Sequence, residues 1–103
     1  MKYAYWLHNL SGIGNGKIHH ILEEVSCAQE LFELPQQQLK GLHGLTEEDC
    51  KVILKSRRNW DLDKEWFSLM AQGIGFVSME QNFFPEKLRH ISNSPYALYY
   101  IGH

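Results

Sequence analysis

The chain has 103 residues, which is room for one domain or for one small domain with an appendage. Hydrophobic residues make up 44% of it and charged residues 21%, proportions that favour a packed core and exclude a disordered chain. No apolar run approaches the roughly 20 residues of a membrane-spanning helix, and the aromatic opening, residues 1–6, is not typical of a secretory signal. We therefore expect a cytoplasmic protein without a membrane segment.

The net charge of −2 excludes a protein that holds nucleic acid mainly through overall basicity. The charge is unevenly spread, because residues 26–50 carry −4 whereas residues 51–75 carry +2. Contact with nucleic acid should therefore be local and weak.

Apolar spacing predicts a first helix over residues 3–9, with one inward stripe formed by Tyr3, Trp6, Leu7 and Leu10. Two glycines around Ile13 then favour a tight bend, since a positive φ costs a residue with a side chain. A second helix should follow from Asn15 to about Val25.

This bend leads directly into a helix start, whose unpaired amides and partial positive charge can accept a phosphate oxygen. The pattern resembles the hairpin of a helix-hairpin-helix motif, a reader of nucleic-acid backbone. The candidate DNA-backbone residues are Gly12, Gly14, Gly16 and Lys17, the last of which adds a full charge. The alternative is an interhelical turn in which Ile13 plugs the core, and the sequence leaves both open.

Two short helices are predicted next. Ser26 can cap the first of them, in which Ala28, Leu31 and Phe32 should face inward. Pro35 suits the first position of the second, over residues 36–40, because a helix start has no use for the missing amide.

Residues 39–46 repeat the design of the first hairpin. Thr46 and Asp49, three positions apart, predict a capping box at the start of a helix over 46–58. Glu47, Glu48 and Asp49 complement the helix dipole and would repel a phosphate. We therefore interpret the second hairpin as structural.

The helix over 46–58 should be buried by Val52, Ile53 and Leu54 and ends in basic residues, where the dipole favours cations. We interpret Lys55, Arg57 and Arg58 first as a solvated helix terminus, and Arg57 and Arg58 secondarily as outlying phosphate contacts. A further helix should start near residue 62 and stop at Gly73, with an inner stripe of Leu62, Trp66, Leu69 and Met70.

The pattern changes after residue 73. We predict a strand over 76–79, a turn at 83–85, one or two helical turns at 85–89, a loop at 92–95 and a strand over 97–101. The last strand is continuously apolar, which is typical of a strand buried on both faces. It could pair with residues 76–79 or with a second copy of the chain, and an unpaired strand of this kind predicts a homodimer through the C-terminal strand.

No catalytic or metal site is expected. Cys27 and Cys50 are predicted to be free thiols, and the adjacent His19 and His20 would point about 100° apart on a helix, too far to share one ion. The sequence offers no nucleophile with an orienting partner and no glycine loop of P-loop spacing, so we expect neither an enzyme nor a bound cofactor.

Taken together, the order of signals resembles the N-terminal region of the DNA-processing protein A (DprA/Smf) family, over nearly all 103 residues. The hairpins alone are unspecific, and their combination with the closing motifs is much more specific. The matching stretches are Tyr-Trp-Leu at 5–7, Leu-Ser-Gly-Ile-Gly-Asn-Gly-Lys-Ile at 10–18, Leu-His-Gly-Leu at 42–45, Gly-Ile-Gly-Phe-Val at 73–77, Phe-Pro-Glu-Lys-Leu at 84–88 and Ser-Pro-Tyr-Ala-Leu-Tyr-Tyr-Ile-Gly at 94–102.

The resemblance implies a mainly α fold: a SAM-like helical domain with tandem helix-hairpin-helix-type turns over 1–72, followed over 73–103 by a short α/β segment that begins an extended Rossmann fold. It also implies a parent protein that binds single-stranded DNA and loads the RecA recombinase during natural transformation. The main DNA-binding and dimer-forming surfaces would belong to the Rossmann part, including a Gly-Ser-Arg motif that we expect to lie downstream of this chain.

Two positions depart from the usual backbone-binding hairpin. Ile18 stands where a small alanine normally lets the helices pack closely, and Gly16 stands where a basic residue is frequent. Both departures weaken the phosphate site. For this chain we therefore favour a module that docks a protein partner or the missing Rossmann half, and weak DNA-backbone binding through the first hairpin is the alternative.

Overall fold

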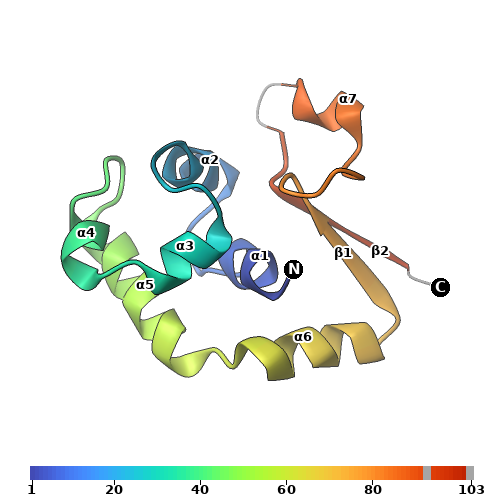
Figure 1. Cartoon of the computed structure of the whole chain (residues 1–103), viewed down its shortest axis with the longest axis horizontal. Helices are drawn as coiled ribbons and strands as arrows, with labels where there is room; N and C mark the ends of the chain where they lie inside the picture. The colour runs from blue at the N-terminus through green and yellow to red at the C-terminus, as the bar shows by residue number, and fades with distance from the viewer. Residues whose placement is uncertain (92–93, 102–103) are drawn as a thin grey trace.

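The computed structural model describes residues 1–91 and 94–101 and shows a mainly helical chain that closes in a two-stranded sheet (Figure 1). The predicted mainly α class is confirmed. The elements, in chain order, are α1 (Lys2–His8), α2 (Asn15–Glu24), α3 (Ala28–Glu33), α4 (Gln36–Lys40), α5 (Glu47–Asn59), α6 (Leu62–Ala71), β1 (Ile74–Ser78), α7 (Glu86–Arg89) and β2 (Ala97–Ile101).

Helix α1 supplies the centre of the core. The predicted stripe is confirmed: Trp6, Leu7 and Leu10 are buried, and Tyr3 is half-buried. The Trp6 indole lies edge-on to Phe32 with 4.9 Å between ring centroids, and its Nε1 donates a hydrogen bond to Ser56 Oγ at 2.9 Å. Because its one polar atom is hydrogen-bonded, this large ring is buried without an unsatisfied donor.

Side-chain caps begin α5 and α6. The capping box at Thr46 is confirmed, with Asp49 N donating to Thr46 Oγ1 and Thr46 N to Asp49 Oδ2, both at 3.0 Å. Asp61 caps α6 with a single hydrogen bond, which its Oδ1 accepts from Lys64 N at 3.1 Å. Gly73 follows α6 with φ of +73°, which confirms the predicted left-handed stop.

The predicted starts of two short helices are wrong by one residue. Cys27, not Ser26, is the N-cap of α3, and Ser26 N instead donates to the Glu30 carboxylate at 2.8 Å, since a glutamate one turn into the helix reaches back to it. Pro35 is the N-cap of α4 and not its first helical residue.

Helix α6 lies at the edge of the molecule and buries a narrower stripe than expected (Figure 1). Leu69 is buried, and Leu62 and Trp66 are half-buried. The placement of Met70 on this stripe is wrong, because Met70 is 51% exposed. A peripheral helix packs against the core along one side only, and Met70 falls beyond that side.

The two strands pair with each other and are antiparallel, with Phe76 opposite Tyr99 and Gly75 opposite Tyr100. Strand β1 begins two residues earlier than predicted and ends at Ser78, so Met79 lies outside it. The inner face of the sheet packs on α1 and α6 through Phe76, whose ring centroid lies 5.5 Å from Tyr5 and 6.1 Å from Trp66.

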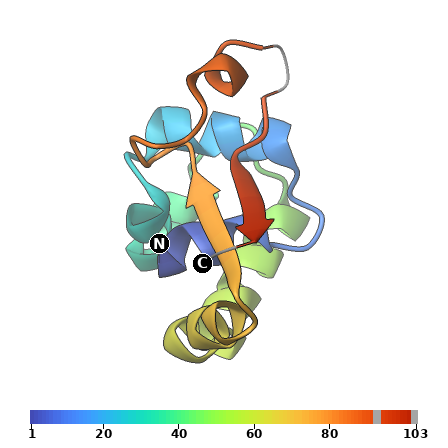
Figure 2. The ribbon, with the colours of Figure 1, turned by 90° about the vertical axis from the view of Figure 1, so that its right-hand side faces the viewer.

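Strand β2 is not buried on both faces, contrary to its apolar sequence. Ala97 is buried, but Tyr99, Tyr100 and Ile101 are exposed by 45%, 47% and 82%. Figure 2 shows the sheet in front of the helices. Tyr100 lies on the face that points away from them, whereas Tyr99 and Ile101 share the inner face with Phe76 and Ile74, their partners on β1. The exposure of Tyr99 and Ile101 therefore shows that the helices cover this end of the inner face only in part.

Polar contacts fasten the closing segment to the helices. Asn15 Oδ1 accepts a hydrogen bond from Tyr96 N at 3.1 Å, and His19 Nε2 lies 2.8 Å from the Ser94 carbonyl oxygen. Phe76, Tyr96 and Ala97 belong to the same hydrophobic core as the helical residues. The division into 1–72 and 73–103 stays a prediction, and residues 92–93 of the predicted loop and Gly102 of the closing motif lie outside the described residues.

Candidate functional site

The first hairpin has the backbone that its glycines suggested. Gly12 has φ of +76°, and Gly14 is the extended N-cap of α2 with φ of −87°. Ile13 between them is buried, so the hairpin also plugs the core, as the alternative interpretation required. Plugging the core and presenting a helix start to a ligand are therefore compatible in one turn.

The start of α2 is open on its outer side. Helix α2 has no side-chain cap, and a Cβ built on Gly12, Gly14 or Gly16 would meet no heavy atom within 4 Å outside its chain neighbours. The first amides of the helix carry the positive end of its dipole. Gly12, Gly14 and Gly16 are all exposed, so this turn faces solvent.

The lysine that should complete this site is bound elsewhere. Lys17 Nζ donates to both carboxylate oxygens of Asp49, at 3.0 and 2.9 Å, across the two hairpins. The Lys17 side chain is 41% exposed and the Asp49 side chain only 8%. The charge that the sequence offered to a phosphate is thus largely neutralised by an internal partner.

Asp49 is deprotonated in its ion pair with Lys17. Its burial alone would raise the pKa, but hydrogen bonds from the Thr46 backbone amide, the Lys17 ammonium and the Thr46 hydroxyl outweigh burial and lower the pKa below the ordinary value. Asp49 is therefore ionised at neutral pH and links the cap of α5 to the first turn of α2.

The hairpins also touch at a second point. A Cβ on Gly44, which has φ of +81°, would lie 2.4 Å from His20 Cδ2, so only glycine lets the second hairpin approach α2 this closely. Nearby, His43 Nδ1 lies 2.9 Å from Glu24 Oε1. The face of α2 that bears Lys17, His20 and Glu24 is therefore occupied by the second hairpin.

The basic end of α5 divides into two kinds of residue. Arg57 Nη1 donates to the Leu31 and Leu34 carbonyl oxygens, at 3.2 and 2.6 Å, and so caps the C-terminal end of α3. The interpretation as a solvated terminus is wrong for Arg57. It holds for Lys55 and Arg58, which are exposed.

Sequence reasoning missed the residues that dock the closing segment. Glu80 Oε1 accepts from Ala28 N at 3.4 Å, at the start of α3, and the buried Tyr96 hydroxyl donates to Glu80 Oε2. Burial, followed by the Glu80 carboxylate, raises the pKa of Tyr96 well above its usual range. The sequence did contain a signal for this docking: the polar residues Asn15 and His19 lie four positions apart and therefore on one face of the helix, where both contact the closing segment.

The outer side of the sheet carries an apolar groove. It has a volume of about 430 Å³ and is lined by Val77, Phe83, Pro85, Leu98, Tyr99 and Tyr100. The Tyr100 ring covers Gly75 on the opposite strand, where a Cβ would lie 2.2 Å from Tyr100 Cε2. This groove is continuous with the exposed part of β2.

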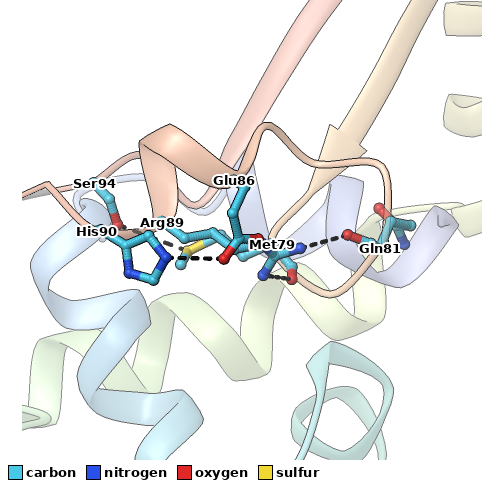
Figure 3. Close-up of polar contacts among 6 residues, drawn as sticks. All are labelled: Met79, Gln81, Glu86, Arg89, His90 and Ser94. Atoms are coloured by element: carbon cyan, nitrogen blue, oxygen red, sulfur yellow. Dashed lines mark hydrogen bonds and ion pairs between the residues drawn. The ribbon is translucent and has the colours of Figure 1, made fainter.

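One arginine fixes the loop that forms the wall of this groove (Figure 3). Arg89 Nη1 donates to the Met79 carbonyl at 2.7 Å and its Nη2 to the Gln81 carbonyl at 2.6 Å. Its guanidinium lies 5.2 Å from the centre of the buried Phe84 ring, and Glu86 contacts it at 3.4 Å. The neighbouring Phe83 is thereby held on a fixed loop while it remains exposed.

Over residues 1–91 and 94–101 there is no group of three or more His, Cys, Asp and Glu side chains placed to hold a metal ion. Cys27 and Cys50 are both free, as predicted, and burial raises the pKa of the Cys50 thiol. Within the same residues, every helix is too short or too polar to cross a membrane.

Comparisons of this chain with protein-family models, with curated proteins and with solved structures give no match.

Proposed function

We propose that this chain is an accessory docking module of a DNA-processing protein of the DprA type. In this proposal, residues 1–72 are a SAM-like helical domain with helix-hairpin-helix-type turns, and residues 73–103 begin an extended Rossmann fold. The parent protein would bind single-stranded DNA and load RecA during natural transformation, in the cytoplasm. The family assignment rests on the sequence resemblance alone.

The observation that carries the docking role is the open outer face of the sheet. Phe83 and Tyr100 expose large apolar side chains there, and both line the groove of about 430 Å³. Two strands alone are marginally stable, and an uncovered sheet with free edges is a typical place for further strands to add. The proposed occupant is the remainder of a Rossmann sheet.

Sedimentation of the chain with a separately produced Rossmann portion of a DprA protein tests this proposal. We expect a complex of one copy of each, which Phe83→Glu abolishes because it places a charge in the groove. Phe67→Glu is the matched control, since Phe67 is 75% exposed on α6, outside the groove. An unchanged sedimentation coefficient on mixing, or equal loss in both variants, would contradict the docking role.

The chain alone, sedimented over a range of concentrations, tests the homodimer through β2 that we also propose. The expected result is a mass that rises from one chain toward two. A mass of one chain at every concentration would refute the dimer and leave the docking proposal standing.

A second candidate is weak, sequence-independent binding of a DNA backbone through the first hairpin. The open, uncapped start of α2 favours it, and the engagement of Lys17 by Asp49 weakens it. Gly16→Asp is the sharpest test, because a carboxylate fits the open space and suits the helix dipole but repels phosphate. If the hairpin binds, low-salt affinity for a labelled oligonucleotide falls in this variant; an unchanged affinity rules this candidate out.

A further inference from the structure

Helices α4 and α5 lie on the opposite side of the molecule from the sheet (Figure 1), and a groove runs between them. One part of it, of about 470 Å³, is lined by Gln36, Lys40, Leu45, Thr46, Glu47, Cys50, Lys51 and Leu54. The next part, of about 370 Å³, is lined by Gln36, Leu54, Arg57 and Arg58. The two parts share Gln36 and Leu54 in their linings, and together we call them the α4–α5 groove.

The α4–α5 groove concentrates positive charge in an acidic chain. Its lining carries Lys40, Lys51, Arg57 and Arg58 against Glu47 alone, whereas the whole chain has a net charge of −2. Among the ion pairs of the described residues, the lysines and arginines engaged are Lys2, Lys17 and Arg89. Within the part of the chain that the structure describes, the cations of the groove therefore form no ion pair.

The spacing of these cations suits a row of phosphates. Lys51 and Arg58 are seven residues apart on α5, which puts them on one helix face about 10 Å apart along the axis. This interval is long enough for each of the two cations to contact a different phosphate of one strand. Lys40 on α4 provides a cation from the opposite wall.

The lining of the groove also argues against recognition of bases and of a protein partner. Its side chains, all within the described residues, include no aromatic ring on which a base could stack. Leu45 and Leu54 are only half-buried and give no deep apolar pocket for the anchor residue of a protein partner. The chemistry that remains is charge recognition of a phosphodiester backbone.

We propose that the α4–α5 groove is a nucleic-acid backbone site, independent of base sequence and distinct from the first hairpin. Lys40, Lys51 and Arg58 are the phosphate contacts, and Arg57, held by the Leu31 and Leu34 carbonyls, supplies a fixed positive charge at the groove floor. Glu47 opposes binding at one end. This inference does not depend on the docking function of the sheet.

Fluorescence anisotropy with a labelled 20-nucleotide oligo-dT at low salt tests the site. Lys51→Ala/Arg58→Ala should weaken binding about tenfold and make the slope of log K against log salt shallower by about 1.4. Lys64→Ala/Lys87→Ala is the matched control, because it removes the same charge from exposed lysines outside the groove and should change the affinity less than twofold. Equal weakening in both double variants, or no binding by the unsubstituted chain, would overturn the proposal.

Two further measurements fix the chemistry. Glu47→Gln should tighten binding about twofold, a gain that misfolding cannot produce, and weaker binding in this variant would count against the groove. An abasic oligomer should compete as well as oligo-dT, whereas oligoglutamate of matched charge should compete poorly. Equal competition by oligoglutamate would indicate that the groove binds an acidic protein segment and not nucleic acid, and would overturn the assignment. Far-UV circular dichroism of each variant checks the fold, and Lys40→Ala repeats the test if the double variant unfolds.

Discussion

Lys17 and Asp49 join the two hairpins through a pair of hydrogen bonds, at 3.0 and 2.9 Å, although 32 positions separate them in the sequence. The same carboxylate closes the capping box of α5 by accepting from the Thr46 amide. One buried side chain thus serves a helix cap and an interhelical contact at once, which makes it the most informative position for mutation.

Asp49→Ala should lower the free energy of unfolding by about 2 to 3 kcal/mol, because it removes the cap and leaves Lys17 without its partner. Glu48→Ala changes an exposed carboxylate in the same helical turn and should stay within about 0.5 kcal/mol. Urea unfolding measures both. Equal losses in the two variants would show that Asp49 acts only through its charge near the helix start.

The pair also predicts a loss of stability in acid. Because the pKa of Asp49 is lower in the folded chain than its ordinary 3.8, its contribution is complete above that value. It is lost as the pH falls through the lower, folded-state pKa. Asp49→Asn should flatten this part of the curve of unfolding free energy against pH, and a curve parallel to that of the unsubstituted chain would contradict the prediction.

The burial of His8 predicts a second dependence of folding stability on pH, in a higher pH range than that of Asp49. Its Nδ1 is buried without a partner in the described residues, beside Phe76 and Tyr99, and burial lowers its pKa below 6.5. The unfolded chain therefore binds the proton more readily, so stability should fall as the pH drops below about 6.5.

His8→Leu should remove this decrease, measured as urea midpoints between pH 7.5 and 5. His43→Gln is the control, since the His43 side chain is 88% exposed, and it should retain the decrease. A decrease that persists unchanged in His8→Leu would assign it to another group.

Two glycines predict opposite effects of the same substitution. Gly16 lies in the first turn of α2 with open space around a Cβ, so Gly16→Ala should raise the free energy of unfolding by about 0.5 to 1 kcal/mol. Gly44→Ala should lower it by more than about 1 kcal/mol, because φ is +81° and the methyl group would collide with His20. Thermal unfolding of both variants gives the comparison, and destabilisation by Gly16→Ala would be the contrary result.

Alanine substitution of the sequence neighbours Arg57 and Arg58 should also have different effects on stability. Arg57→Ala removes the donor to two carbonyls at the end of α3 and should cost about 1 to 3 kcal/mol. Arg58→Ala changes an exposed side chain and should stay within about 0.5 kcal/mol. Denaturant midpoints decide this, and a neutral Arg57→Ala would mean that water replaces its hydrogen bonds without loss.

The sequence by itself determined the features that depend on near neighbours. The stripe of α1, the Thr46–Asp49 capping box and the left-handed stop at Gly73 each need only residues within a few positions, because hydrogen bonding and periodicity within a helix are local. The candidate hairpin was readable for the same reason, since Gly12 needs its positive φ whatever surrounds it.

Tertiary structure decided which partner each charged side chain has and which apolar face is covered. Lys17 could have faced a phosphate, and Arg57 could have been solvated, until folding brought Asp49 and the end of α3 beside them. Met70 and the end of β2 are apolar in sequence yet exposed. Periodicity shows which side of an element could be buried, but burial also requires a second element to lie against that side.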